Sequence, residues 1–170
     1  MFMKMKTQQF ATTIFILIAV TLGSSALHAA QSSNSVALHG VKATKALFDI
    51  NFGDPNKLEL YLGVIEKTYN DLIQQGHKPD FIIAFRGSSV RLITTDTWAF
   101  SEDDQHRLEK GAALLKKLSE QGVRLEACTI ATNLFKIDNN SLLSVIKPVG
   151  NTFVSLIGYQ SKGYSLIPIQ

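Results

Sequence analysis

The chain has 170 residues, with 17 lysines and arginines, 14 acidic residues and a single cysteine, Cys128. The first thirty residues hold Lys4 and Lys6 and no acidic residue, so the net charge of +3 falls to +1 beyond them, which argues against a nucleic-acid partner. One cysteine cannot form a disulfide within the chain, and the remaining residues, about 140 of them, are enough to bury one core without cross-links.

The first thirty residues have the three parts of a secretory signal peptide. Lys4 and Lys6 precede the apolar run 10–22, and the small residues of 23–30 end in an A-x-A-like stretch. Because a helix needs about 20 apolar residues to span a bilayer, this short run favours cleavage over retention as an N-terminal anchor, which is the alternative. We therefore expect signal peptide 1–30, a periplasmic protein and no stable membrane anchor after cleavage.

The next segment leads into the folded part of the chain. Residues 31–42 are small and polar and predict a flexible lead-in to one domain over 43–170. Alternating apolar and polar residues predict a strand over 45–52. Asp54 is placed to cap a helix over 55–75, which begins with proline and carries apolar residues at helical spacing.

The middle of the chain repeats the order of strand and helix. The nearly continuous apolar run 80–86 predicts a strand that is covered on both faces, and residues 90–95 are either a short strand or an irregular turn. Three acidic residues at the start of 102–121 favour a helix N-terminus there. Trp98 and Phe100 lie in the preceding loop, where we expect them to cover the core, with contact to a partner subunit as the alternative.

The last third of the chain continues the alternation. The pattern predicts strands over 123–129, 147–149 and 164–169, and helices over 130–136, 140–146 and 152–161. Strands alternating with helices imply crossover connections, and hence an α/β fold with a mostly parallel sheet covered by helices on both faces. Ligands of such sheets bind beyond the carboxyl ends of the strands, and the single cysteine lies at one of those ends.

Cys128 is the strongest candidate for chemistry. It follows a predicted strand and precedes a predicted helix, whose N-terminal amides would stabilise a thiolate and make it nucleophilic. Arg86 would add positive charge if its strand is adjacent, and Asn51, Gly87 and Thr129 are candidate binding residues at the same strand ends. The alternative is a buried cysteine that packs as a small hydrophobic side chain.

Other motifs carry weaker signals. His39, His77 and His106 are not spaced as metal ligands, and we expect them at the surface. The segment 87–89, glycine followed by two serines, is too short to form a phosphate-binding loop. We therefore expect neither a metal nor a cofactor.

Four segments together resemble the DsrE/DsrF-like family, and more closely its exported branch. They are KALFDINF (45–52), PDFIIAFRGSSVRLI (79–93), LEKGAALLKKLSEQGVRLEACTIATNLFKI (108–137) and VGNTFVSLIGYQSKGYSLIPI (149–169). The resemblance implies a three-layer α/β/α, flavodoxin-like domain with a mainly parallel, five-stranded sheet. It also implies a homo-oligomer, either a trimer or a hexamer.

The resemblance points to one activity and leaves another open. In the sulfur-relay members, the cysteine that matches Cys128 accepts sulfur as a persulfide and passes it on. This implies a sulfur carrier of sulfurtransferase type that works with a sulfur donor or acceptor protein. The alternative is a non-catalytic, oligomeric module that binds a small ligand or a protein and in which Cys128 is structural.

Overall fold

In the computed structural model, residues 34–170 are described, and the predicted signal peptide lies outside the described residues. The segment that was expected to be a flexible lead-in contains a short helix, α1 (Ser35–Leu38). That single turn is followed by Gly40, which has a φ of 75°. The Val41 amide donates a hydrogen bond to the Leu38 carbonyl. Within residues 34–170, no helix has both the length and the apolar character needed to cross a bilayer.

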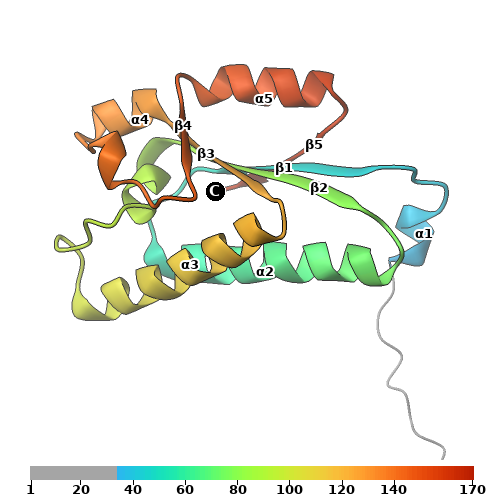
Figure 1. The fold of residues 1–170 in the computed structure, drawn as a ribbon, viewed down its shortest axis with the longest axis horizontal. Helices are drawn as coiled ribbons and strands as arrows, with labels where there is room; N and C mark the ends of the chain where they lie inside the picture. Colours follow the sequence, from blue (N-terminus) through green and yellow to red (C-terminus); the bar gives the residue numbers. More distant parts are fainter. Residues whose placement is uncertain (1–33) are drawn as a thin grey trace, which may run out of the picture. The chain divides into compact units, whose positions relative to one another are not determined.

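Five parallel strands form one sheet, in the order β4-β3-β2-β1-β5. The strands are β1 (Thr44–Ile50), β2 (Pro79–Phe85), β3 (Arg124–Cys128), β4 (Lys147–Val149) and β5 (Ser165–Ile169). The helices are α2 (Pro55–Gln74), α3 (Glu102–Glu120), α4 (Thr129–Leu134) and α5 (Thr152–Ser161). Helices α2 and α3 cover one face and α4 and α5 lie on the other, which confirms the predicted three-layer, flavodoxin-like α/β fold (Figure 1).

One segment was ambiguous in the sequence, and a second differs from its predicted structure. The ambiguous segment 90–95 begins in a 3₁₀ turn, η1 (Gly87–Leu92), and forms no strand of the sheet. The predicted helix 140–146 is wrong, because only the 3₁₀ turn η2 (Asn139–Ser141) forms there. Backbone pairing with the segment after η1 competes with that helix, since Leu142 forms an antiparallel bridge with Thr94.

Polar side chains cap the helices where the sequence places them. The Asp54 carboxylate accepts a hydrogen bond from the Asn56 amide at 2.9 Å, at the start of α2. The Ser101 hydroxyl accepts one from the Asp104 amide at 3.2 Å, at the start of α3. These bonds satisfy amides that have no partner inside the helix, so each helix begins at a defined residue after its strand.

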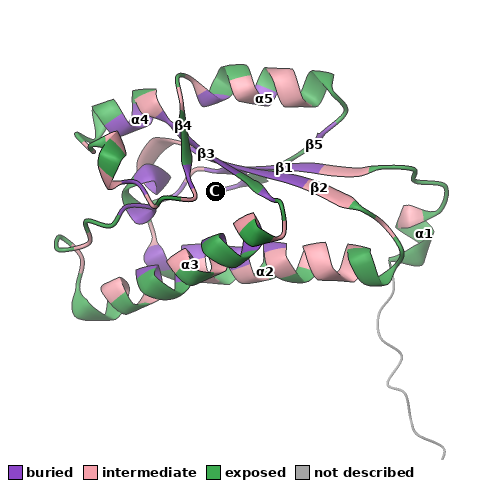
Figure 2. Ribbon diagram, viewed as in Figure 1, coloured by how far each residue is buried: buried purple, intermediate pink, exposed green. Residues whose placement is uncertain are grey.

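The two faces of the sheet are buried in different ways. The main core lies between the sheet and helices α2 and α3, and includes Phe48, Ile50, Phe81, Phe85 and Leu125. The α5 face has a smaller apolar cluster, made of Leu47, Ile82, Ala84, Leu156 and Tyr164. Much of the outer side of α5 and of β5 remains exposed (Figure 2). The α5 face of the sheet therefore has the smaller apolar core, and the candidate site lies on that face.

Candidate thiol site

Cys128 ends β3 and is the N-cap residue of α4. The residue is only 6% exposed, and it packs in a small cluster with Val90 and Ala131, against which Ile137 also packs. The cysteine is therefore at the carboxyl edge of the sheet, as its position in the sequence suggests, but it is nearly covered.

Hydrogen-bonding groups surround the sulfur. Burial alone would raise the pKa of the Cys128 thiol, but the Thr152 hydroxyl and the backbone amides of Thr152, Ala131 and Ile130 stabilise the ionised sulfur and lower that pKa below its ordinary value. These amides come from the starts of two helices, α4 and α5. The fold thus favours the thiolate, which is the nucleophilic form of cysteine.

Thr152 is the group that the sequence analysis missed most clearly. The residue is 1% exposed, and its hydroxyl has no hydrogen-bond partner of ordinary geometry within residues 34–170. Leaving a buried polar group unpaired costs about 1–3 kcal/mol. Ionisation of Cys128 supplies the missing acceptor, because the hydroxyl is close enough to lower the pKa of the thiol.

Arg86 lies near Cys128 but is bound to another residue. The register that pairs Phe85 with Ala127 brings Arg86 next to Cys128. The Arg86 Nε and Nη2 donate to the two carboxylate oxygens of Asp49 at 2.6 and 2.8 Å. The bond to Asp49 raises the pKa of Arg86, and the charge of Cys128 also raises it. The neighbourhood is thus less electropositive than a free arginine would make it.

Asp49 is a second residue that the sequence analysis missed. It is 4% exposed near the carboxyl end of β1, and its carboxylate is bound by the Arg86 guanidinium. An acidic residue in the otherwise apolar stretch 46–50 is a readable signal, because a buried carboxylate requires a partner. The Arg86 guanidinium carbon is also 5.6 Å from the centre of the Phe153 ring, at the start of α5.

The other predicted binding residues support the strand ends. Gly87 has a φ of 55°, and a Cβ atom there would lie 2.1 Å from the Asn51 Oδ1, so the close approach of Asn51 requires glycine. The Thr129 hydroxyl donates to the Gly150 carbonyl at 3.0 Å and ties the end of β3 to the loop before α5. Asn51 and Gly87 therefore fix the ends of β1 and β2, whereas Thr129 helps to hold Thr152 near the thiol.

Metal binding has no candidate cluster in the part of the chain that the structure describes. No three histidine, cysteine, aspartate or glutamate side chains gather there closely enough to hold an ion. What the site offers is a nearly buried thiol with three amides and one hydroxyl around it. That arrangement suits nucleophilic sulfur chemistry, in which the thiolate attacks an electrophilic sulfur.

Comparisons with known proteins place these features in a family. A model described as the DsrE/DsrF-like family matches residues 14–169. An uncharacterized protein of Aquifex aeolicus is 31% identical over 125 residues, which are 73% of this chain and 55% of that protein. The chain therefore spans about half the length of that curated relative.

One solved structure shows the same fold. A protein of unknown function from Methanobacterium thermoautotrophicum, MTH1491, superposes with a TM-score of 0.59 at 19% identity and covers 74% of this chain and 99% of its own. The ychN protein of E. coli gives a TM-score of 0.46 at 16% identity, with the same coverage of 74% and 99%. The first of these supports the α/β architecture described above.

Proposed function

This chain belongs to the DsrE/DsrF-like family, and on that premise we propose that it is an exported sulfur carrier in which Cys128 holds sulfane sulfur as a persulfide. The family membership supports a role related to sulfur relay. The observation that carries the proposal is the Thr152 hydroxyl, which is buried, otherwise unpaired and near enough to stabilise the ionised sulfur. A purely structural cysteine does not require such a partner.

The proposed reaction is a transfer of sulfur between thiols. The Cys128 thiolate attacks the terminal sulfur of a persulfide or polysulfide donor and forms a new S–S bond. The donor's own S–S bond breaks, its electron pair leaves with the donor thiolate, and no outside oxidant is needed. The persulfide on Cys128 is then attacked in the same way by an acceptor thiol, which restores the Cys128 thiolate.

Access to the thiol and subunit assembly belong to the same proposal. Ile130 and Phe153 are 56% and 57% exposed, and each adjoins a residue whose amide stabilises the sulfur. Val154 and Ile157, both 67% exposed, extend this apolar surface along α5. Such a surface supports association with other subunits, as a trimer or hexamer, or with a donor or acceptor protein.

A persulfide-trapping experiment tests the carrier function. The purified protein is treated with polysulfide, desalted and weighed by intact-mass spectrometry. We expect a gain of one sulfur atom that is reversed by a small thiol and is absent from Cys128→Ala. The function is refuted if the wild-type protein gains no sulfur, or if Cys128→Ala gains as much as the wild type.

The proposed export is tested separately from the chemistry. The full chain is expressed in a Gram-negative host, and the mass of the protein recovered from the periplasm is measured. We expect a protein that has lost about the first thirty residues, because the apolar run is too short for a stable anchor. Recovery of the uncleaved chain from the membrane fraction would contradict this expectation.

One observation favours the alternative of a non-catalytic binding module. Cys128 is only 6% exposed and packs against Val90 and Ala131, as a structural cysteine does. Thiol titration of the native protein separates the two functions. A carrier reacts with a small alkylating reagent in the native state, whereas a module with a structural cysteine is labelled only after denaturation.

A further inference from the structure

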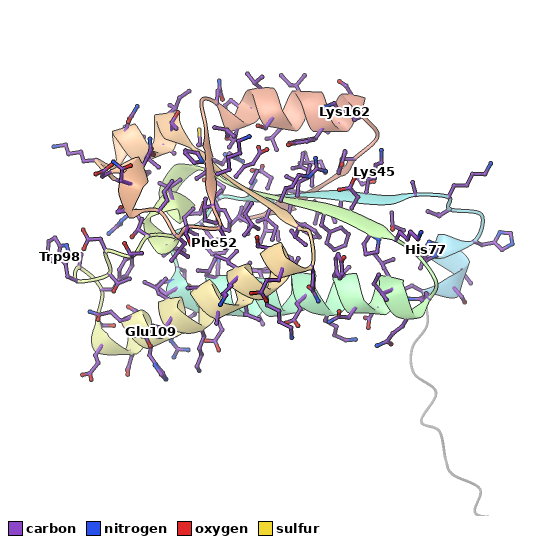
Figure 3. All side chains as sticks on the ribbon, viewed as in Figure 1. Lys45, Phe52, His77, Trp98, Glu109 and Lys162 are labelled. Carbon is purple, nitrogen blue, oxygen red and sulfur yellow. The ribbon has the colours of Figure 1, made fainter. Side chains whose placement is uncertain are left out.

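A cleft with a volume of about 510 Å³ lies beside the α4 segment and does not include Cys128. Its walls come from the loop before α3 and from the residues after α4, including Trp98, Phe100 and Phe135. Figure 3 shows Trp98 on that loop, at the end of the domain where α4 also lies. Its volume lies within the range of sites for small organic molecules, about 300–1,000 Å³.

The exposure of Trp98 corrects the expectation that this residue covers the core. Trp98 is 80% exposed, whereas Phe100 packs partly buried against the main core. Phe135, which also lines the cleft, is 37% exposed. Aromatic rings presented to solvent in one cleft can pack on a flat ligand ring by stacking or edge contacts.

Both signs of charge line the same cleft without pairing to each other. Arg91 and Lys136 supply positive charges and Asp96 a negative one, and none of the three forms an ion pair within residues 34–170. The Arg91 guanidinium carbon lies 5.7 Å from the centre of the Phe100 ring. Asp138 also lines the cleft, but its carboxylate already accepts a hydrogen bond from the Asn140 amide at 2.9 Å.

Lys136 has a strained backbone that places its charge at the cleft. Its φ is 56°, and it is the one non-glycine residue with positive φ in the part of the chain that the structure describes. It ends α4 where glycine or asparagine is usual, with the Lys136 amide bonded to the Asn133 carbonyl and the Ile137 amide to the Thr132 carbonyl. Strain of this kind often marks a residue kept for its side chain.

We propose that this cleft binds a small aromatic zwitterion, of the chemical class of the free aromatic amino acids. The ring of the ligand packs against Trp98 and Phe135. Its carboxylate faces Arg91 and Lys136, and its ammonium group faces Asp96. The cleft carries two positive charges, Arg91 and Lys136, and two negative ones, Asp96 and Asp138. A ligand with charges of both signs therefore fits it better than a simple anion or cation, because a simple ion of either sign meets charges of its own sign.

The single tryptophan makes the site measurable. Trp98 is the only tryptophan of the chain, so its fluorescence, excited at a wavelength that neither phenylalanine nor tyrosine rings absorb, reports on this cleft alone. The purified protein is titrated with L-phenylalanine, 3-phenylpropionate, phenethylamine and L-alanine. We expect L-phenylalanine to bind about threefold to fivefold more tightly than either singly charged probe, since each exposed ion pair contributes about 0.2–1 kcal/mol. L-Alanine is expected to leave the emission unchanged.

Two matched variants assign the charges. Arg91→Gln should weaken binding of 3-phenylpropionate about threefold and leave that of phenethylamine unchanged or tighter, whereas Asp96→Asn should do the reverse. Cys128→Ala should bind all probes as the wild type does, so this test is independent of the carrier function. The proposal is overturned if L-phenylalanine does not change the emission up to its solubility limit, or if both variants affect all charged probes equally.

Discussion

Removal of the Thr152 hydroxyl should separate the reactivity of Cys128 from the stability of the fold. Thr152→Val keeps the shape of the side chain and removes the one side-chain donor near the sulfur. The backbone amides of Thr152, Ala131 and Ile130 remain in place. The pKa of the Cys128 thiol should therefore rise relative to the wild type, because its anion loses a hydrogen bond.

The size of the effect follows from the strength of that bond. A hydrogen bond to a charged group contributes about 1.5–3 kcal/mol, and the lower end of this range lowers the thiolate population at neutral pH about tenfold. A more basic thiolate is also more nucleophilic, with a Brønsted coefficient of about 0.4–0.5. On a logarithmic scale, this higher nucleophilicity offsets nearly half of the decrease in rate that the smaller thiolate population causes. Alkylation at neutral pH should thus slow about threefold to fourfold, and at high pH it should become about threefold faster than in the wild type.

The assay is the rate of alkylation by iodoacetamide across pH, with unfolding by urea measured on the same samples. Thr44→Val is the matched control, because the Thr44 hydroxyl is also buried and unpaired but lies at the start of β1, at the other end of the sheet. Both variants lose a hydroxyl that has no partner while Cys128 is a neutral thiol, so neither should lose stability at a pH low enough to keep the thiol protonated. The reasoning is refuted if the two pH profiles of Thr152→Val and wild type do not cross, or if Thr44→Val shifts the profile equally.

Three further substitutions test the polar groups of the structure. Asp49→Asn should destabilise the fold by about 2–3 kcal/mol in urea unfolding, because it leaves the Arg86 guanidinium without its carboxylate; an unchanged urea midpoint would contradict this. Tyr159→Phe should cost about 1–3 kcal/mol at neutral pH, because the buried Glu126 carboxylate loses its donor at 2.6 Å. Burial and Glu126 raise the pKa of Tyr159 to about 12. The stability that the Tyr159 hydroxyl contributes should therefore be present below about pH 10 and be lost as the pH rises toward 12. If the wild type remains more stable than Tyr159→Phe beyond pH 12, the assignment is refuted. Lys136→Gly should raise the free energy of unfolding by about 0.5–1 kcal/mol by relieving its positive φ, and a lower urea midpoint would show that the lysine side chain outweighs the strain.

Much of the fold could be predicted because its signals are local. Asp54 and Ser101 cap their helices within three residues in the sequence, and apolar periodicity separates helix from strand without reference to the rest of the chain. The helix predicted over 140–146 failed for a nonlocal reason. Its backbone pairs with the segment near Thr94, which is distant in the sequence.

The candidate site could be predicted only in part. The position of Cys128 at a strand end follows from the order of elements, because parallel strands present their carboxyl ends at one edge. The approach of Thr152 depends on how α5 packs on the sheet, and the Asp49–Arg86 pair depends on the register of β1 and β2. Neither contact has a signature in a single stretch of sequence, although the lone aspartate in the otherwise apolar stretch 46–50 was a signal that could have been followed.

The donors around the sulfur have a consequence for when the thiol becomes reactive. The amides and the hydroxyl near Cys128 belong to α4 and α5, and α5 follows both β3 and β4 along the chain. An unfolded chain therefore carries an ordinary cysteine, and the anion gains its full stabilisation only when the last helix has docked. A transient detachment of α5 would remove both Thr152 donors and leave only the amides of α4, so that thiol chemistry would register the opening of one helix in an otherwise folded domain.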